Sequence, residues 1–425
     1  MTEEKYIFTP KTKKNLVMLA VAGVIAVVLG IVLMQSGGHG HGDAHGAEAA
    51  AHGAEAAAHG SAVWLKRVMA GLWINNVFFI GVALIGLFFW SFNYAAQAGW
   101  SAPILRIPMA FSNWLPLGLI LMLVVFFVGG HDIFHWTHEG LYDKASPEYD
   151  PIIDGKKEYL NTPFFLIRMV VYVVVWYLFA KKMQSLSLKE DLEGGHSYWH
   201  KIRVYAALFL VFFGITSSTS AWDWVMSIDT HWFSTLFGWY SMSSWLVSGV
   251  AMTILLVVYL KEKGYLPMVN SNHLHDLGKF LFGFSIFWAY LWVSQFLLYY
   301  YANIPEEVVY YWERWENGLY HGFWFLNIIL NFVLPFLVLM TRDSKRHNIF
   351  LKMVCVIVLA GHWIDFYLGV EPGVMKENGG FGFYEIGITM IYLSAFLFIV
   401  LNSLSKIRLV PKNHPMLQES EHHHI

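Results

Sequence analysis

The sequence predicts an all-α integral membrane protein with about ten transmembrane helices, and three observations carry this prediction. Hydrophobic residues make up 56% of the 425 residues and charged residues only 14%, whereas soluble domains carry about 25% charged residues. Ten apolar runs are each long enough to cross the roughly 30 Å of hydrocarbon in a bilayer. Most of the 28 Lys and Arg residues fall in alternate connecting segments, as the positive-inside rule requires of a multi-pass protein.

Each run justifies one helix, because each offers close to 20 mostly apolar residues, the number that spans the hydrocarbon at about 1.5 Å per residue. Prolines inside some runs, such as Pro116 and Pro335, are tolerated where neighbouring groups satisfy the freed carbonyls. Tryptophan and tyrosine gather at the run ends, as in an aromatic belt. The predicted spans are residues 15–34, 72–94, 113–133, 162–180, 202–222, 236–260, 278–300, 322–341, 349–369 and 383–402.

Short matching motifs four helices apart predict an internal repeat. Asp223 closes the fifth run and precedes FSTLFGWY, whereas Asp365 closes the ninth and precedes FGFYEIG. An even offset preserves orientation in the membrane, so helices 2–5 and 6–9 are predicted to form two four-helix bundles, accompanied by two extra helices. The predicted divisions are a cytoplasmic N-terminus with the first helix at 1–34, an outer spacer at 35–71, the bundles at 72–222 and 223–369, and the last helix with a cytoplasmic tail at 370–425.

The predicted spacer is rich in His, Ala and Glu and repeats HGAEAAA in tandem. His45, His52 and His59 would share one face of a helix, which would allow weak metal binding. Low-complexity tracts of this kind are usually solvated, so we expect a solvated outer segment. Lys and Arg concentrate on the side of the membrane that carries the N-terminus, and both termini are therefore predicted to be cytoplasmic.

Cysteine content and net charge exclude several classes of protein. Cys355 is the single cysteine, so the chain can form no internal disulfide. A thiolate-ligated iron–sulfur cluster typically needs four cysteines, and a c-type haem needs a C-x-x-C-H motif. A net charge of −2 gives no electrostatic reason to expect nucleic acid as a partner.

Few ionisable residues fall inside the predicted spans, and each costs roughly 2.5–3.5 kcal/mol on insertion scales. With the predicted topology they all lie in the outer half of the membrane, where several helices bring them to one depth. Such a cluster is suited to proton transfer or to contact with a quinone. The candidate site residues are His131, Asp132 and His135 at the end of the third helix, Arg168 in the fourth, Asp223 at the end of the fifth, His362 and Asp365 near the end of the ninth, and Glu385 at the start of the tenth.

Pairings within this set suggest roles for individual residues. Arg168 is expected to be the counter-ion of one of the buried acids. Asp365 follows His362 by three residues, so the two share a helical face, and a carboxylate–imidazole pair there would take a proton from a quinol hydroxyl. A structural cap, or a bond to a neighbouring helix, is the alternative for Asp223 and Asp365.

The histidines at the end of the third helix follow helical spacing. His131, His135 and His138 stand at i, i+4 and i+7, with Glu139 beside the last. A proton relay, a quinone contact, a zinc site and interfacial histidines bonded to loop carbonyls are the alternatives. A haem held between His131 and His362 is a further one.

The inner half of the membrane carries smaller polar groups. Ser241, Ser244 and Ser248 form a stripe on the sixth helix, and Asn327 and Asn331 stand one turn apart on the eighth. They would suit a water path toward the cytoplasm, although such stripes are more often helix-packing surfaces.

Several motifs together resemble a known family. The ten spans, the paired repeats, and the segments GGHDIFHW, SAWDWVMSID, FLNIILNFVLPFLVLMTRDSKRH and GHWIDFY resemble the second quinone-binding-type membrane subunit of bacterial alternative complex III. These subunits are similar to the membrane anchors of polysulfide reductases. The resemblance covers nearly the whole chain from the first helix onward, apart from the His-rich spacer.

The resemblance implies a subunit of a menaquinol:cytochrome c oxidoreductase in the bacterial inner membrane. Menaquinone is the implied ligand and no cofactor is bound covalently. Iron–sulfur clusters and haem c belong to partner subunits, namely an iron–sulfur protein and c-type cytochromes. A related quinone-binding membrane subunit and a terminal oxidase are the other implied partners. The related subunit is the better candidate for the main quinol site, so this chain is expected to carry a proton route.

Two other classes of function remain open from the residues. A proton-coupled secondary transporter is compatible with ten helices, an internal repeat and buried acids, although transporter sites usually lie near the midplane in broken helices. A structural membrane anchor that keeps a degenerate site is equally compatible with a duplicated fold.

Overall fold

The protein is described by a computed structural model over residues 5–37, 49–316 and 318–424. Within these ranges the chain is helical and contains no named strand, with one isolated antiparallel bridge between Lys5 and Arg408. The same part of the chain holds ten helical segments long and apolar enough to cross a membrane. The predicted all-α membrane class is therefore confirmed.

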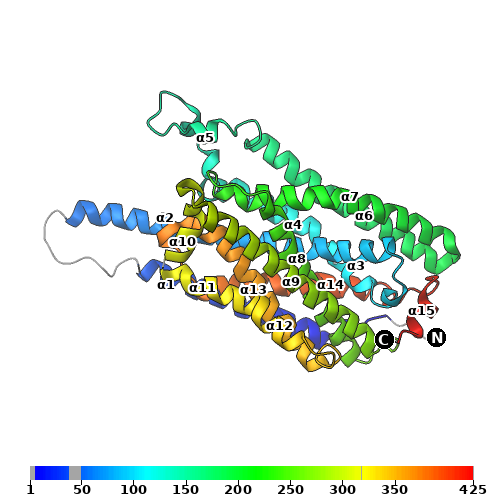
Figure 1. Ribbon diagram of the computed structural model, residues 1–425. Helices are drawn as coiled ribbons and strands as arrows, with labels where there is room; N and C mark the ends of the chain where they lie inside the picture. The colour runs from blue at the N-terminus through cyan, green and yellow to red at the C-terminus, as the bar shows by residue number, and fades with distance from the viewer. Residues whose placement is uncertain (1–4, 38–48, 317, 425) are drawn as a thin grey trace.

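The helices follow one another with short connections (Figure 1). Their bounds are α1 Pro10–Gly37, α2 Ala49–Ala95, α3 Arg106–Phe111, α4 Leu115–Ile133, α5 Pro151–Asp154, α6 Thr162–Glu193, α7 His196–Trp224, α8 Leu236–Glu262, α9 Ser271–Ala302, α10 Pro305–Glu316, α11 Gly318–Ile328, α12 Leu334–Leu339, α13 Asn348–Met375, α14 Phe383–Leu404 and α15 Leu417–Glu421. A π-helical turn, Ile329–Val333, joins α11 to α12.

Helix ends follow local sequence. The hairpin between α6 and α7 turns at Gly194 and Gly195, whose φ angles of 69° and 79° favour glycine because a Cβ would be strained there. The Asn161 side chain accepts a hydrogen bond from the backbone N–H of Phe164 and caps α6. Asn270 forms a capping box at the start of α9.

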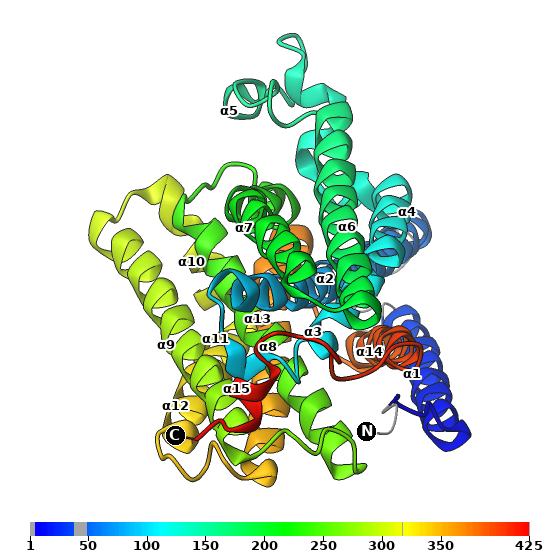
Figure 2. The same cartoon turned by 90° about the vertical axis from the view of Figure 1, so that its right-hand side faces the viewer.

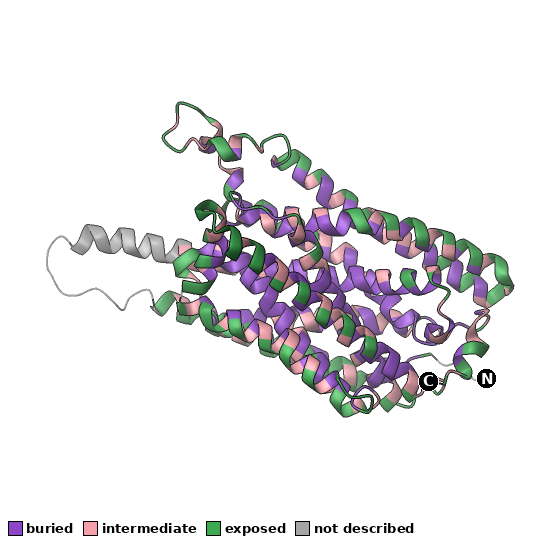
Figure 3. Ribbon diagram, in the orientation of Figure 1, coloured by how far each residue is buried: buried purple, intermediate pink, exposed green. Residues whose placement is uncertain are grey.

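Helices α2 and α8 form the centre of the molecule. In each, 89% of the most apolar stretch is buried, and burial falls toward the outer helices (Figure 3). α2 packs against α4 and α7 and also against α8 and α13, while α8 packs against α7, α9 and α13. The contacts thus cross the predicted boundary between residues 222 and 223, and the division into two bundles stays a prediction.

The two extra helices, α1 and α14, lie side by side along one edge (Figure 2). Glycines allow the close approach. A Cβ on Gly23 would lie 2.7 Å from the carbonyl oxygen of Gly387, and one on Gly30 would lie 2.4 Å from the backbone nitrogen of Tyr384. Small residues at helix contacts commonly bring membrane helices together in this way.

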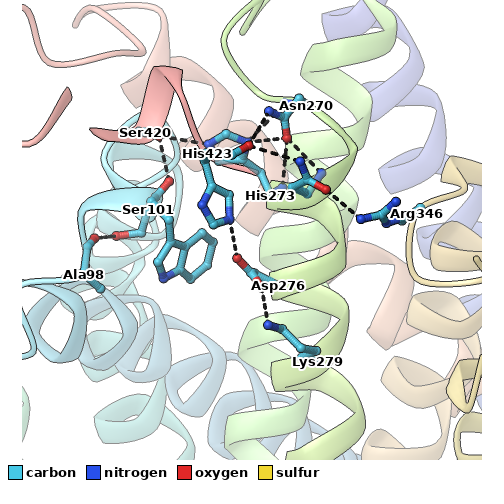
Figure 4. A network of polar contacts seen from close by, with 11 residues as sticks. Ala98, Ser101, Asn270, His273, Asp276, Lys279, Arg346, Ser420 and His423 are labelled. Atoms are coloured by element: carbon cyan, nitrogen blue, oxygen red, sulfur yellow. Dashed lines mark hydrogen bonds and ion pairs between the residues drawn. The ribbon is translucent and has the colours of Figure 1, made fainter. Parts of the chain in front are cut away.

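Both chain termini lie at one end of the molecule, here called the terminal end, whereas α5 and α10 lie at the opposite end (Figure 1). At the terminal end the C-terminal tail is bonded to the helical body (Figure 4). His423 Nε2 lies 2.6 Å from the Asp276 carboxylate, and Asn270 donates to the His423 carbonyl oxygen at 3.1 Å. Ser420 donates to the backbone of Trp100. No role was predicted for these terminal residues.

Several helices are longer than the apolar runs predicted. α2 begins at Ala49, so the second half of the predicted spacer is helical; His45 lies outside the described residues, as do the side chains of His52 and His59. The third span begins at Arg106, where the sequence predicted a loop, and α13 continues to Met375. Ionisable residues in these extensions escaped the apolar criterion although they sit on spanning helices.

Candidate functional site

The Asp365 carboxylate on α13 accepts hydrogen bonds from side chains on three other helices. Its Oδ1 accepts hydrogen bonds from the Tyr240 hydroxyl on α8 and from Asn327 Nδ2 on α11, the latter at 2.8 Å. Its Oδ2 accepts one from Trp288 Nε1 on α9 at 3.0 Å. The side chain is only 3% exposed. The three donors join four helices at one buried carboxyl group.

His362 lies one turn before Asp365 on the same helical face, as predicted, and the two side chains approach without a direct hydrogen bond. His362 Nδ1 is 4.0 Å from Asp365 Oδ2 and instead lies 2.9 Å from the Ser244 hydroxyl. Its Nε2 is buried and has no hydrogen-bond partner among the described residues. An imidazole with one open nitrogen beside a bonded carboxylate can accept a proton and pass it on.

Polar groups continue from this pair toward the terminal end. Asn331 Nδ2 donates to Asn327 Oδ1 at 2.5 Å, and Ser248 donates to the Ser244 carbonyl oxygen. Asn331 sits in the π-helical turn Ile329–Val333. Pro335 has no N–H to bond the carbonyl four residues earlier, and π-turns of this kind often occur at functional sites.

A small cavity lies on the other side of Asp365. It measures about 30 Å³ and is lined by Tyr240, Gln295, Tyr310, Arg314, Asn327 and Asp365, among others. Gln295 Oε1 is buried without a partner among the described residues. Polar walls and this volume give room for at least one water molecule, which would extend the hydrogen-bonded chain away from Asp365.

Arg314 separates this cavity from the opposite end of the molecule. It donates to Asp229 at 2.9 Å and to the Leu368 carbonyl at 2.8 Å, and its guanidinium lies 3.4 Å from the centre of the Tyr310 ring. Next to it, partial burial and then the Asp229 charge raise the pKa of Glu313. Glu313 lines two cavities at this end, of about 620 Å³ and 190 Å³.

A second carboxyl group on α13 is buried and forms no ion pair with the described residues. Glu371 is 1% exposed, and its Oε1 has no hydrogen-bond partner among the described residues. It lies within electrostatic reach of Arg67 and Glu385. Those two form a bidentate pair at 2.7 and 2.8 Å. Glu385, a predicted site residue, is therefore paired with an arginine from the predicted outer spacer.

Arg168 pairs with a buried acid, as predicted, and the structure identifies that acid as Asp223. Arg168 Nε and Nη2 lie 2.7 and 2.9 Å from the two carboxylate oxygens, and Nη1 donates to the Tyr159 carbonyl. The guanidinium also stacks between Tyr159 and Phe164, with ring-centre distances of 3.9 and 4.2 Å. This buried pair links α6 to α7. It balances its own charge and lies apart from the Asp365 group.

His131, Asp132 and His135 do not join the buried groups. All three are exposed at the end of α4, which stops at Ile133, so the structure does not bring them into contact with the buried polar groups around Asp365. The backbone turn after Ile133 folds His138 back, and its ring centre lies 4.7 Å from that of His131. Partial burial of the ring, and then His138 and Lys376, lower the pKa of His135.

The metal and haem alternatives gain no support from this arrangement. Among the described residues no group of three or more His, Cys, Asp or Glu side chains is placed to hold a metal ion. His131 is exposed in the last turn of α4, while His362 is fully buried on α13, so the structure does not bring these two histidines face to face.

Sequence reasoning missed Glu371, Arg314, Asp229 and Arg67. A signal existed for one of them, because Tyr310, Tyr311 and Arg314 at i, i+1 and i+4 are the buried face of α10, a helical pattern.

No protein-family model matches the chain and no curated protein matches its sequence. Any function proposed for this chain therefore rests on its own residues and motifs.

Proposed function

We propose that this chain is a membrane subunit of a quinol:cytochrome c oxidoreductase complex and that it supplies a route for protons. Menaquinol is the substrate that the motif resemblance suggests, and partner subunits would carry the iron–sulfur clusters and haem c. With a single cysteine in the chain, Cys355, a four-cysteine cluster would have to belong to a partner.

The observation that carries the proposal is the environment of Asp365. A carboxyl group inside a membrane protein is expensive and usually functional. Here it is bonded by three helices, stands 4.0 Å from His362, and borders a cavity with room for water. A carboxyl and an imidazole this close can hold one proton between them, and the protein groups around them fix where that proton resides.

The proposed route runs along α13 in both directions from Asp365. Toward the terminal end it follows Asn327, Asn331 and the serines of α8, whose hydroxyl and amide groups can orient water. Toward the opposite end it passes the small cavity and reaches Glu313, because Tyr310 lines both that cavity and one of the cavities that Glu313 borders. The raised pKa of Glu313 suits exchange with the aqueous side.

The Arg168–Asp223 pair has a different role in this proposal. Both carboxylate oxygens are engaged by one guanidinium, so protonating Asp223 would leave a buried arginine without its counter-charge. The pair therefore serves to fix α6 against α7 and is not placed on the proton route.

The test is proton coupling in the reconstituted complex. In proteoliposomes, Asp365→Asn is expected to lower the number of protons moved per electron while the complex still assembles. Asp132→Asn is the matched control, since Asp132 is an exposed carboxylate in the last turn of α4, and it should leave the ratio unchanged. An unchanged ratio in Asp365→Asn would refute the route.

One observation favours the transporter alternative. The π-turn Ile329–Val333 and Pro335 interrupt the eighth span beside Asn331, and broken helices commonly form transporter sites. The adjoining cavity of about 30 Å³ accommodates water and excludes larger solutes. Solute uptake by vesicles containing this chain alone would support a transporter, whereas haem-containing partners that co-purify with it would support the complex.

A further inference from the structure

A long apolar groove runs between α13 and α14. Its volume is about 590 Å³, and its walls come from α1, α2, α8, α13 and α14. It extends from Glu385 to Leu401 along α14, which at 1.5 Å per residue is a length of about 24 Å. One leaflet of the hydrocarbon is about 15 Å thick, so the groove is long enough to hold an acyl chain over its whole length.

The groove is open to the lipid side of the molecule. Val356 on α13 and Ile386 on α14 line it and are 58% and 47% exposed, and Ala360 between them in depth is exposed as well. Inner wall residues such as Phe79 and Ile364 are buried. A hydrocarbon chain can therefore enter from the bilayer without any helix moving.

The two ends of the groove differ in charge. At the opposite end Glu385 is paired with Arg67 and also accepts from the Gly382 N–H, so this end offers no net charge. At the terminal end the groove finishes at Thr12 and Tyr259. Lys13 follows Thr12 directly, and the Lys263 ammonium lies 5.9 Å from the centre of the Tyr259 ring.

These lysines have no counter-charge of their own among the described residues, since no ion pair there includes Lys13 or Lys263. Lys11 and Lys14 add to the same first turn of α1. The hydroxyls of Thr12 and Tyr259, 3.3 Å apart, provide further donors. Basic groups between membrane helices at the polar boundary are the usual partners of anionic lipid head groups.

We propose that this groove is a binding site for an anionic phospholipid. One acyl chain lies between α13 and α14, and the phosphate is held at the terminal end by Lys13, Lys263 and the neighbouring hydroxyls. The lipid would fill the gap between the α1–α14 pair and the rest of the molecule. This inference does not depend on the proposed redox function, because it uses none of the residues of the Asp365 group.

The first test changes the groove. The purified full-length chain, with any subunits that accompany it, is washed in detergent, and the retained lipids are extracted and measured by mass spectrometry. Ala360→Trp should fill the groove and remove most of the retained phosphatidylglycerol and cardiolipin. Ala207→Trp is the control, because Ala207 is an exposed alanine on α7, and it should retain lipid as the wild type does.

The second test changes the charge and keeps the groove. Lys13→Gln with Lys263→Gln should weaken binding of added phosphatidylglycerol by about fivefold for each lysine, with no change for phosphatidylcholine. Lys182→Gln with Lys201→Gln is the control, since each of these lysines lies over an aromatic ring, as Lys13 lies over Phe8 and Lys263 over Tyr259. The surface lysine variants report on the site even where Ala360→Trp does not fold.

Three outcomes would overturn the proposal. Retained lipid could be the same in the groove variant as in its control. Phosphatidylcholine could be retained as well as phosphatidylglycerol, with no effect of the lysines. A quinone, or a helix of a partner subunit cross-linked to Ala360, could occupy the groove in place of a phospholipid.

Discussion

Substitutions of Asp365 distinguish a role of its carboxyl group in proton transfer from a purely structural role as a hydrogen-bond acceptor. Asn keeps one oxygen and replaces the other with an N–H₂ group. With its oxygen at the Oδ1 position, Asn retains the bonds from Tyr240 and Asn327 but points a donor at Trp288 Nε1. Leu removes all three acceptor contacts. The two variants therefore remove different numbers of hydrogen bonds, but both remove the carboxyl group that could carry a proton.

The expected magnitudes follow from the number of donors left without a partner. One buried donor without an acceptor costs about 1–3 kcal/mol, so Asp365→Asn should lower the free energy of unfolding by about that amount. Asp365→Leu leaves three buried donors without an acceptor, so it should lower the free energy of unfolding by about 3–5 kcal/mol or more. Proton coupling, in contrast, should be lost in both variants because neither side chain can carry the proton.

The single cysteine makes the stability measurement specific. Cys355 is fully buried on α13, ten residues before Asp365, so a thiol-reactive dye labels it only when this helix leaves its packed position. Heating the purified protein with the dye gives a melting curve for α13 itself. The curve should shift modestly for Asn and strongly for Leu.

Wild-type proton coupling in Asp365→Asn, together with a modest melting shift, would refute the reasoning. It would show that the carboxyl acts only as a hydrogen-bond acceptor. Equal melting shifts for Asn and Leu would contradict the assignment of donors to the two oxygens.

Three further predictions concern other parts of the molecule. Arg168→Gln should destabilise the protein by about 3–5 kcal/mol because it leaves a buried carboxylate unpaired, and adding Asp223→Asn should recover part of this loss in a thermal melt. Gly361→Ala should cost about 1–3 kcal/mol, since its Cβ would lie 2.2 Å from Asn331 Oδ1 and 2.8 Å from Leu330 Cβ; adding Asn331→Ala should recover part of the lost melting temperature, and no recovery would place the strain elsewhere. Burial, and then the Arg106 charge, lower the pKa of His414 from 6.5 to about 4, so the unfolded chain binds a proton that the folded chain does not, and stability should fall as the pH drops from about 6.5 toward 4. His414→Gln should flatten this dependence in melts at a series of pH values, and an unchanged slope would contradict the assignment.

The sequence was sufficient for the spanning helices and for one ion pair. Apolar runs revealed all ten spans because length and composition alone decide them. Arg168 could be matched with an acid because a lone cation inside hydrocarbon requires a counter-charge, and Asp223 was one of few available. Nothing in the sequence decided between Asp223 and Asp365 as its partner, since that choice depends on how the helices pack.

The remaining parts of the site lay outside the apolar runs. Glu371 follows the point where the ninth run was ended, yet α13 continues through Pro372 to Met375. Arg314 belongs to α10, an amphipathic helix that folds back onto the opposite end of the molecule and was assigned to a loop. Exposure likewise depends on tertiary packing, and for that reason the sequence could not show that His131, Asp132 and His135 are exposed while His362 and Asp365 are buried.

The pairing of α1 with α14 has a consequence for how the protein is made. α1 begins at Pro10 and α14 begins at Phe383, which is 373 residues later (383 minus 10). At about 5–20 residues per second, the ribosome needs roughly 20–75 seconds to synthesise that stretch. During that interval α1 is in the membrane while the helix that fits its glycines, Gly23 and Gly30, does not yet exist. The first helix inserted, α1, therefore has no packing partner until the last helix, α14, is made. A chain truncated before α14 would leave α1 unpaired and exposed to the quality-control proteases of the membrane.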